Sequence, residues 1–317
     1  MKIGFIGVSG HWRYALNESL NHTVIGCAAG FNEEDMTSLI AAYAQENVTV
    51  PEMTADELFA LRPDVLVINT RFDLNAVYTL RALKENIFVF SEKPLAINEK
   101  DLEALESTAT TAFVSAMFGI TYEPWCLTMR ENIGRIGEIR MINAQKSYKM
   151  LKRPEFYKHK ETFGGLLPWV GIHAMHWISF VTDLRFTSVT AQANALCNNG
   201  HGDMETSAAA LFTMENGAFA TLNADYYRPE AAKTHDDDRL RIAGTEGVIE
   251  YQRGRVTLIN ENGEQELPML SGQDIFKLFL DRIEDGTSGI SQEESVYITR
   301  VALAAERSAE DGERKTL

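Results

Sequence analysis

Residues 1–12, MKIGFIGVSGHW, run from an apolar strand directly into a glycine turn. Similar short apolar runs, rich in β-branched residues, recur at 23–29, 64–70, 87–92 and 112–117. The stretches between them, such as 32–46 and 73–86, carry apolar residues at helical spacing. Strands that are apolar throughout and alternate with helices predict an α/β domain built on a doubly wound parallel sheet. Such sheets bind ligands beyond the carboxyl ends of their strands.

After about residue 120 the pattern changes to longer, partly alternating runs punctuated by turns. One turn is Asn216-Gly217, a hairpin signal between two such runs. We therefore expect two domains, at 1–120 and 121–317, the second an α/β domain with a large open antiparallel sheet. Ser291 with Glu294 predicts a capping box for the last helix and Gly312 its end, and this helix can pack back toward the first domain.

The composition limits the class of protein and its partners. The 317 residues are 45% hydrophobic and 24% charged, as in globular proteins with sizeable cores. A net charge of −15 opposes phosphate backbones and anionic lipid, so neither nucleic acid nor membrane is an expected partner. Three scattered cysteines favour a reducing cytoplasm over a disulfide framework. The opening residues resemble neither a secretion signal nor a membrane span.

The turn GFIGVSGHW is a partial dinucleotide-binding loop. Gly7 can form the tight turn, but Ser9 occupies the second glycine position and Trp12 the third, so an ordinary glycine turn remains an alternative. Gly10 restores some backbone freedom. The second strand ends at Ala29, where an acid would hold the ribose of NAD, and no basic residue follows to bind the phosphate of NADP. Either cofactor therefore remains open.

The fourth of these apolar runs ends in Glu92-Lys93-Pro94, which places a lysine at the ligand-binding edge of the sheet. Pro94 holds Lys93 in an extended geometry. A lysine there can stabilise an alkoxide during hydride transfer, although most lysines after a strand are simply exposed.

The stretch 163–177, FGGLLPWVGIHAMHW, predicts a helix that begins at Pro168. Trp169, His173, His176 and Phe180 then lie on one side of it. Both histidines can be core groups, or His173 can be an acid/base. A metal pair would need a third ligand, and His235 with the acids at 236–238 is the one obvious source. We expect no metal.

SEKPLAIN (91–98) resembles the Glu-Lys-Pro signature of the glucose-fructose oxidoreductase/inositol dehydrogenase (Gfo/Idh/MocA) family. The glycine turn, the stretch VINTRFDLNAVYTLRAL (67–83), GRIGEIR (134–140) and GTEGVIEY (244–251) resemble the same family in the same order. This resemblance implies a Rossmann domain that binds NAD or NADP, a second substrate-binding and dimerisation domain, and chemistry in the cleft between them. It also implies a homodimer or homotetramer that transfers hydride to or from a hydroxyl carbon of a sugar, polyol or related small molecule.

The resemblance assigns the functional residues by position. Lys93 and His173 are the implied catalytic pair. Trp169 stands where the family has an aspartate, His176 where it often has a second one, and Asn75 where it often has histidine. An indole cannot accept a hydrogen bond, so the aspartate's role does not carry over. Together with the residues near this pair in the sequence, the candidate substrate residues are Lys93, Tyr157, Trp169, His173 and His176. The implied cofactor residues are Gly7, Ser9, Gly10, His11, Trp12, Asn69, Thr70, Glu92 and Lys93.

Other residues and functions remain open. Tyr157 and His159 lie on a predicted loop, and Arg228 with the run 234–239 can bind hydroxyls, although a solvated loop is the simpler interpretation of that run. The departures at Ser9, Ala29 and Trp169 favour a rival function, a nucleotide- or sugar-binding protein without turnover, because fold does not establish activity. A nicotinamide enzyme with different chemistry, such as imine or enone reduction or redox-assisted glycoside cleavage, is a third option.

Overall fold

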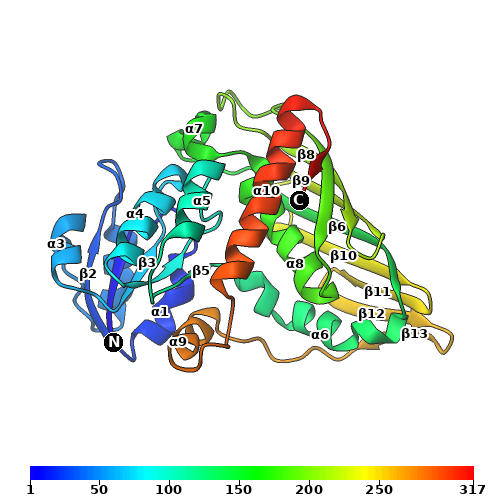
Figure 1. Cartoon of the computed structure of the whole chain (residues 1–317), viewed down its shortest axis with the longest axis horizontal. Coiled ribbons are helices and arrows are strands. Elements are labelled where there is room, and N and C mark those ends of the chain that lie inside the picture. Colours follow the sequence, from blue (N-terminus) through cyan, green and yellow to red (C-terminus); the bar gives the residue numbers. More distant parts are fainter. The chain divides into compact units, whose positions relative to one another are not determined.

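The computed structural model describes residues 1–317, and the chain forms two compact units (Figure 1). Unit 1 comprises Met1–Gly119, Glu161–Phe163 and Asp274–Thr299. Unit 2 comprises Ile120–Lys160, Gly164–Gln273 and Arg300–Leu317. The sequence predicts two continuous segments that meet at residue 120, whereas the structure also returns two later segments to unit 1.

Unit 1 is built on a five-stranded parallel sheet with the strand order β2-β1-β3-β4-β5. The strands are β1 (Lys2–Ile6), β2 (Thr23–Ala28), β3 (Val65–Ile68), β4 (Phe88–Ser91) and β5 (Val114–Ala116). Its helices are α1 (Leu16–Ser19), α2 (Thr37–Gln45), α3 (Ala55–Ala60), α4 (Phe72–Lys84), α5 (Glu99–Ser107) and α9 (Ile275–Asp285). The predicted doubly wound parallel sheet is confirmed, with all five strands at the predicted places.

The return of 274–299 to unit 1 has a hydrophobic cause. Phe276 and Phe279 of α9 pack against Phe90 of β4, with ring centroids 5.1 and 5.3 Å apart. The start of α10 (Gln292–Asp311) then bonds the edge strand β5, where the Ala116 N–H donates to the Ser295 hydroxyl at 3.0 Å. Aromatic burial of this kind depends on residues almost 200 positions apart, which a local sequence pattern does not reveal.

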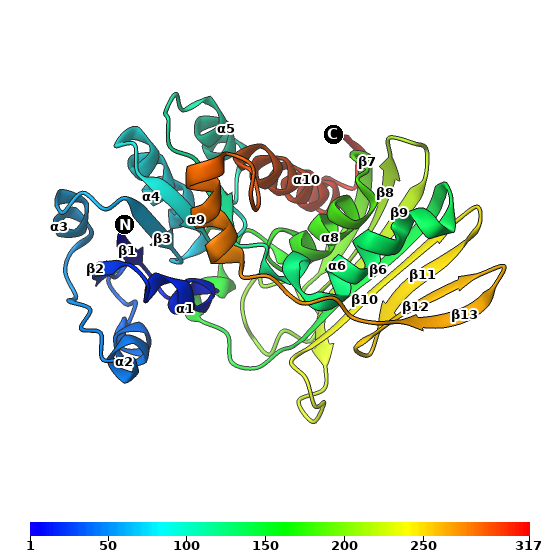
Figure 2. The same cartoon turned by 90° about the horizontal axis from the view of Figure 1, so that it is seen from below.

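Unit 2 is built on a nine-stranded sheet with the order β13-β12-β11-β10-β6-β9-β8-β7-β14 (Figure 2). Neighbouring strands are antiparallel except for the parallel pair β6 and β9. The turn at Asn216-Gly217 joins β8 and β9, and Gly217 has the positive φ of 81° that such a turn needs. The strands are β6 (Ile139–Lys149), β7 (Phe186–Asn194), β8 (Ser207–Met214), β9 (Phe219–Arg228), β10 (Asp236–Gly244), β11 (Gly247–Gln252), β12 (Arg255–Asn260), β13 (Gly263–Leu267) and β14 (Lys315–Thr316).

Helices cover one face of this sheet and leave the other open. The longer helices of unit 2 are α6 (Pro124–Asn132), α8 (Ile172–Thr182) and the end of α10. On the covered face, Trp125 of α6 stacks on Tyr251 of β11 at 4.2 Å and meets Trp177 of α8 edge-on at 5.2 Å. A short helix α7 (Lys160–Phe163) precedes α8. None of the helices is both long and apolar enough to cross a membrane.

Candidate functional site

The glycine turn after β1 admits no side chain. Gly7 has a φ of 77°, and a Cβ there would lie 2.6 Å from the Thr70 Cα and 2.7 Å from the Asn69 carbonyl oxygen. The Ser9 N–H donates to that same carbonyl at 2.6 Å. The turn therefore rests directly on the end of β3, which brings three of the predicted cofactor residues, Ser9, Asn69 and Thr70, to one edge of the sheet.

A carboxylate that the sequence interpretation missed lies at this edge. Glu34 accepts hydrogen bonds from the Val8 N–H at 2.9 Å, the Ser9 hydroxyl at 2.5 Å, the Gly30 N–H at 2.9 Å and the Thr70 hydroxyl at 2.9 Å. Glu34 as a whole is only 8% exposed to solvent. Glu34 thus brings an acid to the end of β2, where the sequence shows Ala29.

The turn that places Glu34 beside the glycine loop also delays the start of the next helix. The sequence predicts a helix over 32–46, but α2 begins only at Thr37. Residues 31–36 instead form a turn in which the Glu34 N–H donates to the Phe31 carbonyl at 3.1 Å. The pair of acids in NEE (32–34) after Gly30 was the only sequence signal for this carboxylate.

A second buried carboxylate, Glu92, fixes the other side of the loop. It accepts from the His11 N–H at 2.5 Å and the Lys93 N–H at 2.9 Å, and its oxygen lies 2.8 Å from the His11 Nδ1. Burial pushes the pKa of Glu92 up, but His11 and Lys93 outweigh it and the pKa is lowered overall. A Cβ at Gly10 would lie 1.9 Å from a Glu92 oxygen, so the loop needs glycine there.

Lys93 lies two residues after the end of β4, and its side chain is fully buried. Its Nζ is 4.0 Å from the Glu92 Oε1, and the peptide bond to Pro94 is cis. Glu92 is ionised at neutral pH because its pKa is lowered, so it provides a negative charge beside the ammonium group. The structure thus places His11, Glu92 and Lys93 in contact.

The polar groups at this edge fit a dinucleotide. Both amide atoms of Asn69 are buried without a hydrogen-bond partner, and buried amides are rarely left so unless a ligand satisfies them. The first turn after the loop, Trp12–Ala15, has no side-chain cap, so the Trp12 and Arg13 N–H groups can donate hydrogen bonds to phosphate oxygens. The Trp12 indole itself is buried under Arg13, so Trp12 offers only its backbone. Asn75 accepts from the Thr70 N–H at 3.2 Å and so supports this edge.

In unit 2, two glycines with positive φ precede the helix that carries the histidines. Gly164 and Gly165 have φ values of 83° and 115°, and a Cβ at Gly165 would lie 2.3 Å from the Glu306 carboxyl carbon. Glu306 forms an ion pair with Lys160, which also binds Glu205 at 2.8 Å. Burial, followed by the charge of Glu205, raises the pKa of Glu306 well above its usual range.

The helix that carries the histidines departs from the predicted one. Leu167–Gly171 forms a π-helical turn that contains Pro168 and Trp169, and the α-helix α8 starts only at Ile172. Inserted π-helical turns occur frequently at functional sites. His173 lies in the first turn of α8 and is 1% exposed. Trp169 is 6% exposed and meets the Tyr157 ring edge-on at 6.2 Å.

His176 has a clear structural partner. Its Nδ1 lies 2.6 Å from the Thr121 hydroxyl, and its ring lies 6.2 Å from that of Phe180. Burial, and then the charge of Arg130, lower the pKa of His176 to about 3, so its ring is neutral. These contacts support a packing role, and a substrate role for His176 stays a prediction.

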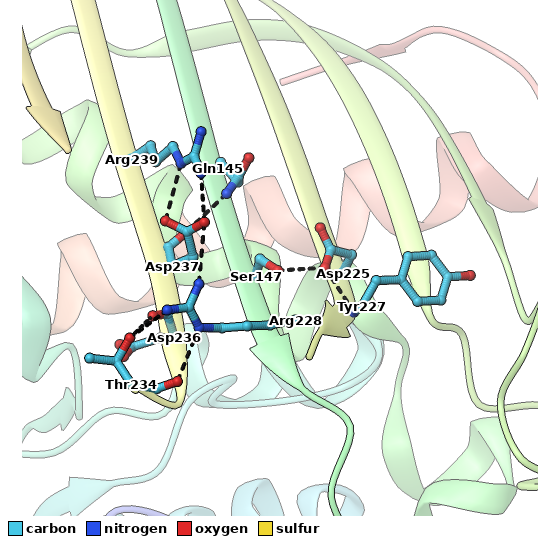
Figure 3. A network of polar contacts seen from close by, with 9 residues as sticks. All are labelled: Gln145, Ser147, Asp225, Tyr227, Arg228, Thr234, Asp236, Asp237 and Arg239. Atoms are coloured by element: carbon cyan, nitrogen blue, oxygen red, sulfur yellow. Dashed lines mark hydrogen bonds and ion pairs between the residues drawn. The ribbon is translucent and has the colours of Figure 1, made fainter. Parts of the chain in front are cut away.

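The run 234–239 is mostly a strand and not the solvated loop that we expected. Asp236–Gly244 forms β10, because its side chains alternate between the two faces of the sheet. Figure 3 shows Asp237 on the open face, bound to Arg239 at 2.7 Å and to Arg228 at 3.3 Å. Arg228 also donates to Thr234. No group of three histidine, cysteine, aspartate or glutamate side chains is arranged to hold a metal ion.

The other two acids of that run meet a lysine that sequence reasoning missed. Lys146 of β6 is fully buried, and its Nζ lies 2.7 Å from Asp238 and 3.4 Å from Asp236. The ammonium group also lies 4.7 Å from the Tyr148 ring and 5.2 Å from the Trp177 ring. Burial raises the pKa of Asp238 to about 7 although Lys146 lowers it. Alternation along β6 places Lys146 on the covered face.

Comparisons with known proteins agree with both units. A model of the oxidoreductase family with an NAD-binding Rossmann fold matches residues 1–119, and a model of the GFO/IDH/MocA C-terminal domain matches residues 128–250. A solved Thermotoga maritima structure described as an oxidoreductase is 43% identical, with a TM-score of 0.96 and 100% of each chain covered.

Two enzymes are more distant relatives. 1,5-Anhydro-D-fructose reductase from Ensifer adhaerens is 26% identical over 300 residues, which cover 86% of each chain. Glucose-6-phosphate 3-dehydrogenase from Bacillus subtilis is 27% identical over 210 residues, 61% of this chain and 57% of its own. The predicted oxidoreductase class and nicotinamide cofactor are confirmed. Because family models match both parts of the chain, the protein belongs to the Gfo/Idh/MocA family of NAD-binding oxidoreductases.

Proposed function

We propose that the protein transfers a hydride between NAD and a hydroxyl-bearing carbon of a sugar or polyol, with Lys93 and His173 as its proton-handling groups. The buried Lys93 after β4, with its amine 4.0 Å from the ionised Glu92, is the observation that carries this proposal. The two enzymes named above are a sugar reductase and a sugar-phosphate dehydrogenase, which supports the same substrate class.

The chain's own groups would divide the work as follows. The nicotinamide ring, when bound, supplies the site that gains or loses the hydride. Lys93 stabilises the negative charge that develops on the substrate oxygen, and its burial strengthens this interaction. His173 takes the hydroxyl proton during oxidation and returns it during reduction. Trp169 cannot orient the His173 imidazole as an aspartate would, and with Tyr157 it offers an aromatic surface to the sugar ring.

Glu34 supports NAD over NADP. Rossmann proteins that hold NAD commonly place an acid at the end of β2, where it bonds the ribose hydroxyls. The Glu34 carboxylate lies at that place through its bond from the Gly30 N–H. A 2′-phosphate there would meet a like charge in a largely buried position.

Titration with NADH and NADPH, followed by cofactor fluorescence, tests the first step. We expect binding of NADH and a weaker response to NADPH, and no binding of either would refute the proposal. Turnover on a panel of sugars and polyols tests the second step. Lys93→Ala and His173→Ala should each lower kcat by about 100-fold or more, whereas Lys84→Ala, a change at an exposed lysine of α4, should not.

The rival proposal, a binding protein without turnover, has a specific observation in its favour. The catalytic aspartate of the family is replaced by Trp169, whose ring packs against Tyr157. The same experiment separates the two functions. Sugar and NAD binding with no hydride exchange in the wild type would favour the binding protein.

We also propose that the protein is a cytoplasmic homodimer or homotetramer that associates through the open face of the nine-stranded sheet. Strand register places exposed Phe219, Met141 and Ile259 in one row across this face, and a monomer gains nothing from exposing them. Phe219→Glu should shift the mass measured by light scattering to that of a monomer. The three cysteines are free thiols, which supports a reducing compartment.

A further inference from the structure

Arg153 is a cation without an acidic partner. It follows β6, and its one hydrogen bond runs from Nη2 to the Lys149 carbonyl at 2.7 Å. Its Nε is buried and has no acceptor. A guanidinium group offers five donors in a rigid fork, so most of the hydrogen-bonding capacity of Arg153 is unused. In a chain with 45 acidic and 30 basic residues, an arginine that pairs with no carboxylate needs an explanation.

The charge of Arg153 is reinforced by its neighbours. Lys149 also pairs with no carboxylate, since its Nζ donates to the Ala232 carbonyl at 2.6 Å. The pKa of nearby His235 is lowered chiefly by partial burial and then by the charge of Arg153, while the charge of Asp236 opposes this shift. Arg153 and Lys149 thus bring two cations without carboxylate partners to the end of β6, although the whole chain is acidic. Lys146 is already paired with Asp238, which leaves Arg153 and Lys149 as the available cations.

Aromatic rings connect this positive region to the helix of His173. The Arg153 guanidinium lies 4.4 Å from the Tyr226 ring and 5.9 Å from the Tyr157 ring. Tyr157 in turn meets Trp169 edge-on at 6.2 Å, and Trp169 lies about one turn before His173. A ligand that bonds Arg153 would therefore have its remaining atoms along aromatic surface, toward the residue proposed as the acid/base.

We propose that Arg153, assisted by Lys149, binds an anionic group of the substrate, so that the substrate class is anionic sugars rather than neutral ones. The shared chemistry is a carboxylate or a phosphate, since the parallel N–H donors of a guanidinium group can bind two oxygens of either group. Arg153 and Lys149 are half-buried and His235 is exposed, so an anion can reach them from solvent. This assignment rests on the proposed sugar oxidoreductase function.

The test compares matched ligands on the full-length protein, with and without NAD⁺. One set is glucose, glucuronate and glucose 6-phosphate, and a second is ribitol, ribonate and ribitol 5-phosphate. Dissociation constants are measured by calorimetry for the wild type, Arg153→Met, Arg153→Lys and Lys152→Met. The last variant removes an exposed cation next to Arg153 and is the matched control.

In the wild type we expect at least one anionic ligand to bind ten times or more tighter than its neutral counterpart. Arg153→Met should reduce this preference by about tenfold, Arg153→Lys should reduce it less, and Lys152→Met should leave it intact. Tighter binding of the carboxylates or of the phosphates identifies which anion the site takes.

Two results would overturn the assignment. In one, no anionic ligand binds better than its neutral counterpart. In the other, Arg153→Met weakens neutral and anionic ligands equally, as a packing defect would. Failure of NADH binding, measured separately at unit 1, would refute the oxidoreductase function without touching the anion preference. The two proposals therefore fail on different readouts.

Discussion

Buried carboxylates have opposite surroundings in the two units. In unit 1, Glu34 accepts four hydrogen bonds from backbone and hydroxyl donors, and Glu92 is bound to His11 and lies beside Lys93. In unit 2, Asp238 and Glu306 each keep one carboxylate oxygen that is buried without a partner. The pKa of Glu92 is accordingly lowered, whereas burial raises the pKa of Asp238 to about 7.

The difference follows from the number of donors offered to each acid. The loops of unit 1 turn several N–H groups toward each carboxylate, so its charge is stabilised in place. In unit 2, Lys146 serves Asp236 and Asp238, and Lys160 serves three glutamates including Glu306. The acids of unit 1 therefore act as braces of the cofactor loop, whereas burial raises the pKa values of Asp238 and Glu306 in unit 2.

Removing the Lys146 ammonium group, which pairs with Asp236 and Asp238, should have the largest effect on stability. Lys146→Met leaves Asp238 buried beside no positive charge, and the free energy of unfolding should fall by about 2–3 kcal/mol at pH 9, where the wild-type carboxylate is ionised and protonation no longer relieves the loss of the cation. Urea denaturation followed by circular dichroism measures this change. The double variant Lys146→Met/Asp238→Asn should recover most of the loss. A single-variant loss below about 1 kcal/mol would mean that the pair is not coupled as the geometry indicates.

The second prediction concerns the pH dependence of stability. The pKa of Asp238 is raised from an ordinary 3.8 to about 7, so between these values the folded state holds a proton that the unfolded chain releases. Stability should therefore fall as pH rises from about 4 to 7, by up to about 1.4 kcal/mol per pH unit from this group. The difference in the pH dependence of the free energy of unfolding between wild type and Asp238→Asn isolates the contribution of this carboxyl group. An equal slope in both proteins would contradict it.

For unit 1 the sharper test is cofactor choice. Glu34→Gln keeps the shape of the side chain and removes the charge at the end of β2, so the preference for NADH over NADPH should fall by about tenfold. Dissociation constants for both cofactors provide the measurement. Glu33→Gln, a change at an exposed neighbour, is the control. If Glu34→Gln leaves the ratio unchanged, Glu34 braces the loop without selecting the cofactor.

The smallest effect is expected on the open face of the sheet. The Arg239 and Asp237 side chains are 41% and 21% exposed, so water screens their 2.7 Å ion pair (Figure 3). Arg239→Met should change the free energy of unfolding by less than about 1 kcal/mol. A larger loss in thermal or urea denaturation would show that the buried and exposed ion pairs do not differ as burial predicts.

Local patterns predict much of the fold. The five strands of unit 1 lie where apolar runs alternate with helical stretches, because a parallel sheet buries both faces of each strand. The cap of α10 is equally local, since the Glu294 N–H bonds the Ser291 hydroxyl at 3.0 Å. A local pattern does not predict that residues 274–299 belong to unit 1, because their place depends on aromatic side chains that meet only after folding.

The candidate site is predictable to a smaller extent. Gly7, Ser9 and Glu92 stand at strand ends, and strand ends locate ligand edges directly. The sequence does not predict the role of Glu34, because its position depends on a turn of six residues. It does not predict the role of Lys146 either, because that role depends on strand register. Arg153 carries no motif at all. The π-helical turn at Trp169 is likewise invisible to a helical periodicity that assumes 3.6 residues per turn.

Transfer of a substrate hydrogen to the cofactor tests the central claim most directly. The wild-type protein, NAD⁺ and sugars or polyols deuterated at their hydroxyl-bearing carbons are incubated, and deuterium at C4 of the resulting NADH is measured by mass spectrometry. We expect deuterated NADH in the wild type and its loss in both Lys93→Ala and His173→Ala. Deuterium transfer that survives unchanged in both variants, or NAD⁺ binding without any transfer in the wild type, would contradict it.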